Sequence, residues 1–244
     1  MDTQDTAAHH DAGRDPFTAV VVLSGGMDST TLLAHYAALR FTLVAVTVDY
    51  GQRHRKEIDS ARRIARHYGA THHVVDFAGF GRLLGGSALT DADVAVPDGH
   101  FAEDAMRATV VPNRNAVLAN IALSVAVARG ADTVALGMHA GDHFVYPDCR
   151  PAFIDALRHL AAVANEGFVV PRIEAPFMTW SKRDIALHGT RLGAPLELSW
   201  SCYKGGDIHC GTCGTCYERR EAFREADVAD PTAYLDSVTR FAAP

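Results

Sequence analysis

Short apolar runs rich in β-branched residues alternate with amphipathic segments along most of this chain. The runs predict buried strands, and the segments between them predict helices that end at glycines such as Gly69 and Gly130. The expected strands are 19–23, 43–48, 74–77, 133–138 and 172–177, and the expected helices are 29–39, 57–68, 115–128, 151–165 and 181–192. Because strands that alternate with helices pair in parallel, this order predicts an α/β fold, a doubly wound parallel sheet with helices on both faces.

The length of 244 residues fits one folded domain. Residues 1–16 are polar and lack apolar periodicity, so we expect a disordered leader there and a single domain over residues 17–244. Residues 80–111 show no clear pattern and predict a functional loop. No apolar run suits a signal peptide or a membrane span, which predicts a cytoplasmic protein without a membrane partner. The net charge of −6 disfavours nucleic acid as a partner.

The turn after the first expected strand has the composition of a phosphate-binding loop. Its residues are Ser24, Gly25, Gly26, Met27, Asp28, Ser29 and Thr30. The glycines let successive backbone N–H groups point at an anion, and the following helix N-terminus adds partial positive charge. Asp28 fits an anion site if magnesium lies between it and the phosphates. The alternative is a plain tight turn in which Asp28 or Ser29 caps the helix.

Four of the five cysteines lie close together near the C-terminus. They are Cys202, Cys210, Cys213 and Cys216, in the pattern Cys-x7-Cys-x2-Cys-x2-Cys. Such spacing lets thiolates converge on a tetrahedral site, so we expect a small zinc knuckle over residues 202–216, followed by a helical tail. A disulfide pair and an iron–sulfur cluster are the alternatives. The fifth cysteine, Cys149, is expected to be a small buried residue.

The Ser-Gly-Gly-x-Asp-Ser pattern after the first strand resembles the pyrophosphate-binding loop of the PP-loop ATPases, which have the Rossmann-like adenine nucleotide α-hydrolase fold. The resemblance implies that ATP is split into AMP and pyrophosphate. The loop would hold the leaving phosphates while a substrate oxygen attacks the α-phosphorus. That chemistry adenylates the substrate.

Further motifs narrow the resemblance to one family. They are Gly51-Gln52-Arg53-His54, Val111-Pro112-Asn113-Arg114-Asn115, Tyr146-Pro147-Asp148-Cys149-Arg150, Ser181-Lys182-x-Asp184 and the cysteine knuckle. Together with the loop they resemble the 7-cyano-7-deazaguanine synthases of queuosine biosynthesis. The resemblance implies a carbon–nitrogen ligase that converts 7-carboxy-7-deazaguanine and ammonium, with two ATP, into the nitrile preQ0. An acyl-adenylate and an amide would be intermediates.

The same resemblance implies roles for individual residues. Besides Asp28 and the rest of the loop, Lys182 would neutralise phosphate charge in the transition state, and Arg114 would position ATP. The residues expected to line the acceptor pocket are Asp142, Tyr146, Asp148 and Arg150. Without the motif context, a surface ion pair for the two cations and a structural salt bridge for Asp148 and Arg150 are the alternatives.

The sequence departs from the family pattern at Ala140 and at Phe144-Val145, which leaves the acceptor acid open. An amide-forming ligase for a related acid, and a PP-loop enzyme that delivers sulfur to transfer RNA, are the enzymatic alternatives. A nonenzymatic nucleotide-binding adaptor is the third. The expected partners are small molecules, namely the acid, ATP and ammonium, and the resemblance implies a homodimer.

Overall fold

A computed structural model describes residues 17–99, 106–142 and 145–235 of the chain. Within these ranges five strands form one parallel sheet in the order β3-β2-β1-β4-β5. The strands are β1 (Thr18–Val22), β2 (Thr42–Asp49), β3 (Thr71–Asp76), β4 (Thr133–Ala135) and β5 (Arg172–Glu174). The helices are α1 (Met27–Ala38), α2 (Lys56–His67), α3 (Ala78–Leu83), α5 (Arg114–Arg129), α6 (Pro151–Ala164), α7 (Lys182–Arg191) and α8 (Gly214–Glu225).

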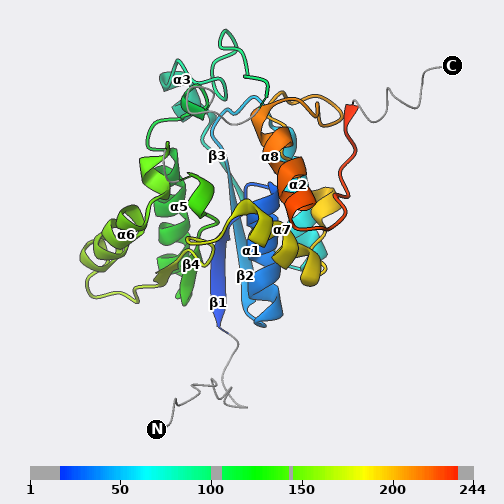
Figure 1. Cartoon of the computed structure of the whole chain (residues 1–244). Helices are drawn as coiled ribbons and strands as arrows, with labels where there is room; N and C mark the ends of the chain where they lie inside the picture. Colours follow the sequence, from blue (N-terminus) through cyan, green and yellow to red (C-terminus); the bar gives the residue numbers. More distant parts are fainter. Residues whose placement is uncertain (1–16, 100–105, 143–144, 236–244) are drawn as a thin grey trace, which may run out of the picture.

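Different helices cover the two faces of the sheet (Figure 1). Successive side chains of a strand point to opposite faces, so Ala19 and Val21 of β1 join an apolar cluster with α1, α2, α7 and α8. Val20 lies on the other face, in a second cluster with α5 and α6. The predicted doubly wound parallel sheet is therefore confirmed.

The strand order changes direction beside β1, which pairs with β2 on one side and with β4 on the other. Loops that leave the carboxyl ends of such neighbouring strands turn to opposite faces, and open α/β sheets bind ligands in the crevice between them. Gly137, after β4, lies next to the start of α1, where a Cβ on it would be 3.7 Å from the backbone nitrogen of Ser29. The glycine turn after β1 thus opens into this crevice.

Several boundaries differ from the predicted ones. β4 ends at Ala135 rather than 138: Leu136 still donates its N–H to Glu174 at the end of β5, and the chain then leaves the sheet. β5 likewise ends at Glu174 rather than at the predicted 177. β3 begins at Thr71, three residues earlier than expected, because this partly exposed strand starts with polar residues that hide its pattern.

The segment in which no element was predicted contains α3 at its start. Its Gly81 approaches β2 so closely that a Cβ would lie 2.0 Å from the carbonyl oxygen of Tyr50. Arg53 holds the following loop by donating to the carbonyls of Asp91 and Val94. The loop therefore packs over the carboxyl end of β2, as an excursion tied to the motif that follows that strand.

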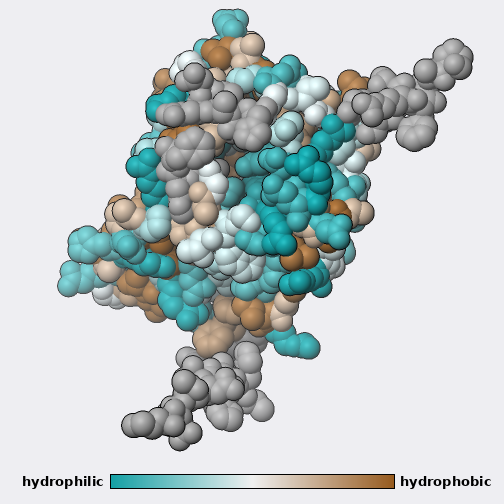
Figure 2. All heavy atoms as spheres, in the orientation of Figure 1, coloured by the Kyte–Doolittle hydropathy of each residue, from teal (hydrophilic) through white to brown (hydrophobic). Residues whose placement is uncertain are grey.

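Helices α7 and α8 carry mainly hydrophilic residues on the face shown in Figure 2. Among the described residues, no helix has the length and apolar character needed to cross a membrane. The leader predicted for residues 1–16 lies outside the described residues.

Candidate active site

The glycine turn after β1 is shaped by close packing against α2. Gly25 has a φ of +94°, and a Cβ there would lie 2.1 Å from the carbonyl oxygen of Glu57. Its N–H donates to Ser29 Oγ, and its carbonyl accepts from Trp200 N–H at 2.8 Å. Only glycine satisfies both the positive φ and this approach. The turn is thus fixed between α2 and the segment that leads to the cysteines.

The loop leaves the N-terminus of α1 open toward a cavity of about 230 Å³. Gly26 is the N-cap residue and supplies no side chain to cap the first N–H groups, which suits them to bind an anion. Of the predicted loop residues, the cavity is lined by Ser24, Gly26, Met27, Asp28 and Ser29. Gly25 and Thr30 instead shape the turn, because Thr30 is buried and donates its hydroxyl to Gly26 O.

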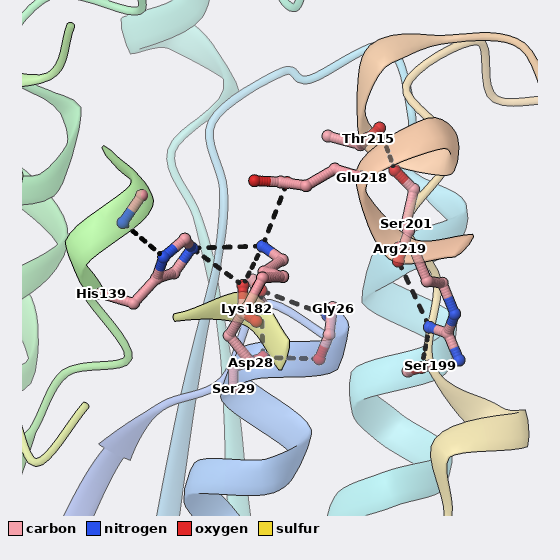
Figure 3. Close-up of polar contacts among 12 residues, drawn as sticks. Gly26, Asp28, Ser29, His139, Lys182, Ser199, Ser201, Thr215, Glu218 and Arg219 are labelled. Carbon is pink, nitrogen blue, oxygen red and sulfur yellow. Dashed lines mark hydrogen bonds and ion pairs between the residues drawn. The ribbon is translucent and has the colours of Figure 1, made fainter. Parts of the chain in front are cut away.

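Asp28 and Lys182, both predicted site residues, meet in the cavity (Figure 3). Lys182 Nζ lies 2.8 Å from Asp28 Oδ2, 3.3 Å from Glu218 Oε2 and 3.2 Å from His139 Nε2. A capping box between Ser181 and Asp184 starts α7 and so places Lys182 at its first position. One lysine thus joins elements from three distant parts of the chain.

Asp28 is ionised in this setting, and one of its carboxylate oxygens accepts no hydrogen bond among the described residues. Burial alone would raise the pKa of its carboxyl, but the charge of Lys182, with a smaller contribution from His139, outweighs burial and lowers that pKa. Oδ1 is buried and has no hydrogen-bond partner among the described residues. A free carboxylate oxygen beside an anion-binding helix start fits a magnesium ligand.

The cavity is also lined by Arg114, at the first position of α5. Its guanidinium lies 6.0 Å from the centre of the Tyr50 ring and approaches the Tyr50 hydroxyl at 3.5 Å. Asn115, the next residue, donates its side-chain amide to Cys149 Sγ at 3.1 Å. Cys149 is buried and lines the cavity, in keeping with the expected small buried residue.

The four residues predicted for the acceptor pocket lie at different places relative to the cavity. Tyr146 lines the cavity and shares a hydrogen bond with Thr109 Oγ1 at 2.8 Å. Asp148 instead accepts from the backbone N–H of Asn115 at the start of α5, and Arg150 is the exposed N-cap residue of α6. Neither is among the lining residues. Asp142 ends a short 3₁₀ turn that begins at Ala140, and its side chain is not among those described.

The four clustered cysteines form a site with the geometry of a metal centre. Their sulfur atoms all lie within 4.8 Å of one another, and Cys210 Sγ is 3.9 Å from Cys216 Sγ. Tetrahedral bonds of about 2.3 Å would separate sulfurs by about 3.8 Å, so the arrangement suits one ion. Backbone N–H groups of Thr212 and Cys213 donate to Cys210 Sγ. All four cysteines are free of disulfide bonds.

The cysteine site supports the cavity from outside. Thr215, on α8, donates to Ser201 O, and both residues line the cavity (Figure 3). Arg219 is almost completely buried and donates to Ser199 Oγ and to Leu196 O. These bonds tie α8 to the segment before the first cysteine. His209, beside Cys210 in the chain, accepts from Ser201 N–H through Nε2 at 3.0 Å.

Sequence reasoning missed several residues of the cavity. His139 and Glu218 contact Lys182, and Tyr50, His54 and Glu57 line the α2 side. The Gly-Gln-Arg-His motif was a usable signal for His54, because it follows the carboxyl end of β2. For Glu218 no signal existed, because a glutamate on a charged helix looks like a solvated surface residue.

The parallel sheet, the glycine turn after its first strand and the Asp28–Lys182 pair at the strand ends define a PP-loop protein, the class of α/β proteins that use ATP in this crevice. Comparison with known proteins places the chain more closely. A family model described as "Queuosine biosynthesis protein QueC" matches residues 18–227. The chain belongs to this family.

Its relatives include named enzymes. The 7-cyano-7-deazaguanine synthase of Rhizobium johnstonii is 54% identical over 217 residues, which cover 89% of this chain and 92% of that protein. The one of Brucella anthropi is 51% identical over 218 residues, or 89% and 94%. The NMN synthetase from Francisella tularensis, a solved structure, is 11% identical with a TM-score of 0.47, covering 92% of this chain and 82% of its own. The predicted resemblance to the synthases is confirmed.

Proposed function

We propose that this chain is an ATP-dependent ligase that converts 7-carboxy-7-deazaguanine and ammonium into 7-cyano-7-deazaguanine. Relatives at 51–54% identity that span nearly the whole chain support the reaction. The observation that carries the proposal in the structure is the ionised Asp28, paired with Lys182 at an uncapped helix N-terminus inside the cavity. Together they supply what a triphosphate needs, namely N–H donors, a cation and a ligand for a metal ion.

Adenylation is the first half of the proposed chemistry. A carboxylate is a poor electrophile, so its oxygen attacks the α-phosphorus of ATP and pyrophosphate leaves into the loop. The N–H groups at the start of α1 hold the leaving phosphates, and Lys182 moves from Asp28 to balance their growing charge. Magnesium, bound through Asp28, would neutralise phosphate oxygens. Arg114 lines the same cavity and positions the nucleotide or the acid.

Nitrile formation repeats the same chemistry. Ammonia displaces AMP from the acyl-adenylate and gives the amide. A second ATP adenylates the amide oxygen, and loss of AMP leaves the nitrile. Because both rounds transfer the adenylyl group to an oxygen on the same carbon, one cavity can serve both. Tyr146 supports an acceptor position beside Arg114, whereas the roles of Asp142, Asp148 and Arg150 toward the acid stay predictions.

We further propose zinc as the ion of the cysteine site, since four closely spaced thiolates without disulfides match its preferred ligands. The same cluster opposes the sulfur-delivery alternative, because it occupies the cysteines with one another. The net charge of −6 supports small-molecule partners over nucleic acid. We also propose that the protein forms a homodimer in the cytoplasm and that residues 17–244 fold as a single domain.

The test is incubation of the purified protein with ATP, magnesium, ammonium and 7-carboxy-7-deazaguanine, followed by mass spectrometry of the products. We expect the nitrile, and a loss of activity of at least about 100-fold in Asp28→Asn, in line with removal of one electrostatic group from a reaction site. Asp59→Asn is the matched control, because Asp59 is an exposed carboxylate on α2 that forms an ion pair with Arg62. An amide that is never converted would support the alternative ligase, and no product would contradict both.

A further inference from the structure

His54 and Glu57 line the cavity and form a polar cluster with Gln52. Gln52 donates from Nε2 to Glu57 Oε1 at 2.8 Å and accepts from the N–H of Tyr50 at 3.0 Å. The second oxygen of Glu57 lies 3.3 Å from His54 Nε2. All three side chains of the cluster are buried. None of them belongs to the glycine turn or to the Asp28–Lys182 pair.

The partners of His54 fix which of its nitrogens is free. Since Nε2 faces a carboxylate oxygen, the neutral ring carries its proton there and has a lone pair on Nδ1. Nδ1 is buried, and no hydrogen-bond partner for it exists among the described residues. Buried polar atoms are nearly always satisfied, so an unpaired acceptor in a residue that lines a cavity indicates a ligand with a hydrogen to donate.

The same cluster favours a small cation. Glu57 is 8% exposed, and among the described residues no lysine or arginine forms an ion pair with it. The neighbouring basic side chains are engaged elsewhere, Arg55 with Asp49 and Lys56 with Asp207. The ring of Tyr203 lies 4.9 Å from that of His54. Aromatic rings beside a buried carboxylate stabilise an ammonium ion.

We propose that the His54–Glu57 pair is the ammonium site of the reaction, in which His54 Nδ1 accepts the proton that the attacking nitrogen releases. The inference rests on the proposed function and adds the residues that receive the second substrate. The cavity supports it, because His54 and Glu57 line the same cavity as Asp28 and Arg114, so nitrogen held by the pair and the adenylated acid would share one chamber. Glu57 stabilises the imidazolium that forms.

The step balances as follows. Ammonium yields ammonia by losing a proton to solvent, and its lone pair forms a C–N bond with the acyl carbon. The bond between that carbon and the AMP oxygen breaks, and its electron pair leaves with AMP. The new nitrogen carries one proton too many, which goes to His54 Nδ1 and from there to water. In the second round the same nitrogen again loses protons as the nitrile forms, so the same base serves twice.

The test separates adenylation from attack by nitrogen. His54→Gln keeps an N–H that reaches Glu57 but places no acceptor at Nδ1, and His67→Gln is the matched control on the exposed end of α2. ATP–pyrophosphate exchange with the acid, without ammonium, measures adenylation alone. Amide formation is then followed with ammonium, and acyl hydroxamate formation with hydroxylamine, which is already a free base at neutral pH.

We expect H54Q to exchange pyrophosphate within about twofold of the wild type and to form amide at least about 100-fold more slowly, the usual effect of losing a general base. The loss with hydroxylamine should be similar, because its nitrogen also releases a proton once the C–N bond has formed, and H67Q should behave as the wild type. Equal losses in exchange and amide formation would show a structural role and overturn the inference, as would an unaffected amide rate. A wild type that never exchanges pyrophosphate would instead overturn the proposed function, and the inference with it.

Discussion

Gly25 offers a sharp test of how the phosphate loop is built. In Gly25→Ala the new methyl group would lie 2.1 Å from Glu57 O and 2.8 Å from Ala61 N, both backbone atoms of α2. The φ of +94° adds strain, at roughly 1–2 kcal/mol for a residue with a Cβ. Displacing a packed helix adds about 1–3 kcal/mol. We therefore predict a loss of about 2–5 kcal/mol in the free energy of unfolding.

Thermal denaturation followed by circular dichroism measures this loss. For a chain of this size each kcal/mol lowers Tm by about 2–4 °C, so Gly25→Ala should lower it by about 4–20 °C. Gly26→Ala is the matched control, since Gly26 has a φ of −76° and its nearest neighbour would be a movable side-chain atom, Ser24 Oγ, at 3.4 Å. It should change stability by less than about 1 kcal/mol. Equal Tm values for the two variants would refute the packing of the turn on α2.

Three further predictions concern the rest of the molecule. Elemental analysis should find one zinc per chain, which Cys213→Ser removes and Cys149→Ser retains; iron in its place would contradict the zinc assignment. Arg219→Ala should lower the free energy of unfolding in urea by about 3–5 kcal/mol, because it removes the cation 3.2 Å from the largely buried carboxylate of Asp230; a change below about 1 kcal/mol would show that this ion pair does not stabilise the fold. Burial lowers the pKa of both His35 and His188, so the unfolded chain binds protons more readily, and stability should fall as pH drops below about 6.5. His188→Gln should flatten that slope, and an unchanged slope would exclude the pair as its source.

Local sequence patterns were sufficient for the sheet and for the two motifs that lie on contiguous residues. The run before Ser24 ends a strand and the glycines follow it, so the loop could be recognised without knowing the rest of the fold. The four clustered cysteines could be recognised in the same way, because they lie close together in the sequence. The helix that carries Lys182 starts with a capping box that is visible in the sequence.

Contacts between distant segments could not be predicted in this way. Glu218 and His139 reach Lys182 only because α8 and the loop after β4 converge at the carboxyl end of the sheet. Asp148 was expected in the pocket on motif grounds, but it bonds to the N-terminus of α5, a partner 33 positions away. Acidic residues suit helix starts as well as ligands, and sequence alone does not distinguish these uses.

The transfer of oxygen from the acid to AMP tests the proposed adenylation most directly. The acid is prepared with both carboxylate oxygens replaced by the heavy isotope and incubated with ATP, magnesium and ammonium. We predict AMP and pyrophosphate as products, with one heavy oxygen in the AMP released in each round and none in the pyrophosphate. Unlabelled AMP, or ADP with phosphate, would contradict attack on the α-phosphorus in the crevice beside Asp28.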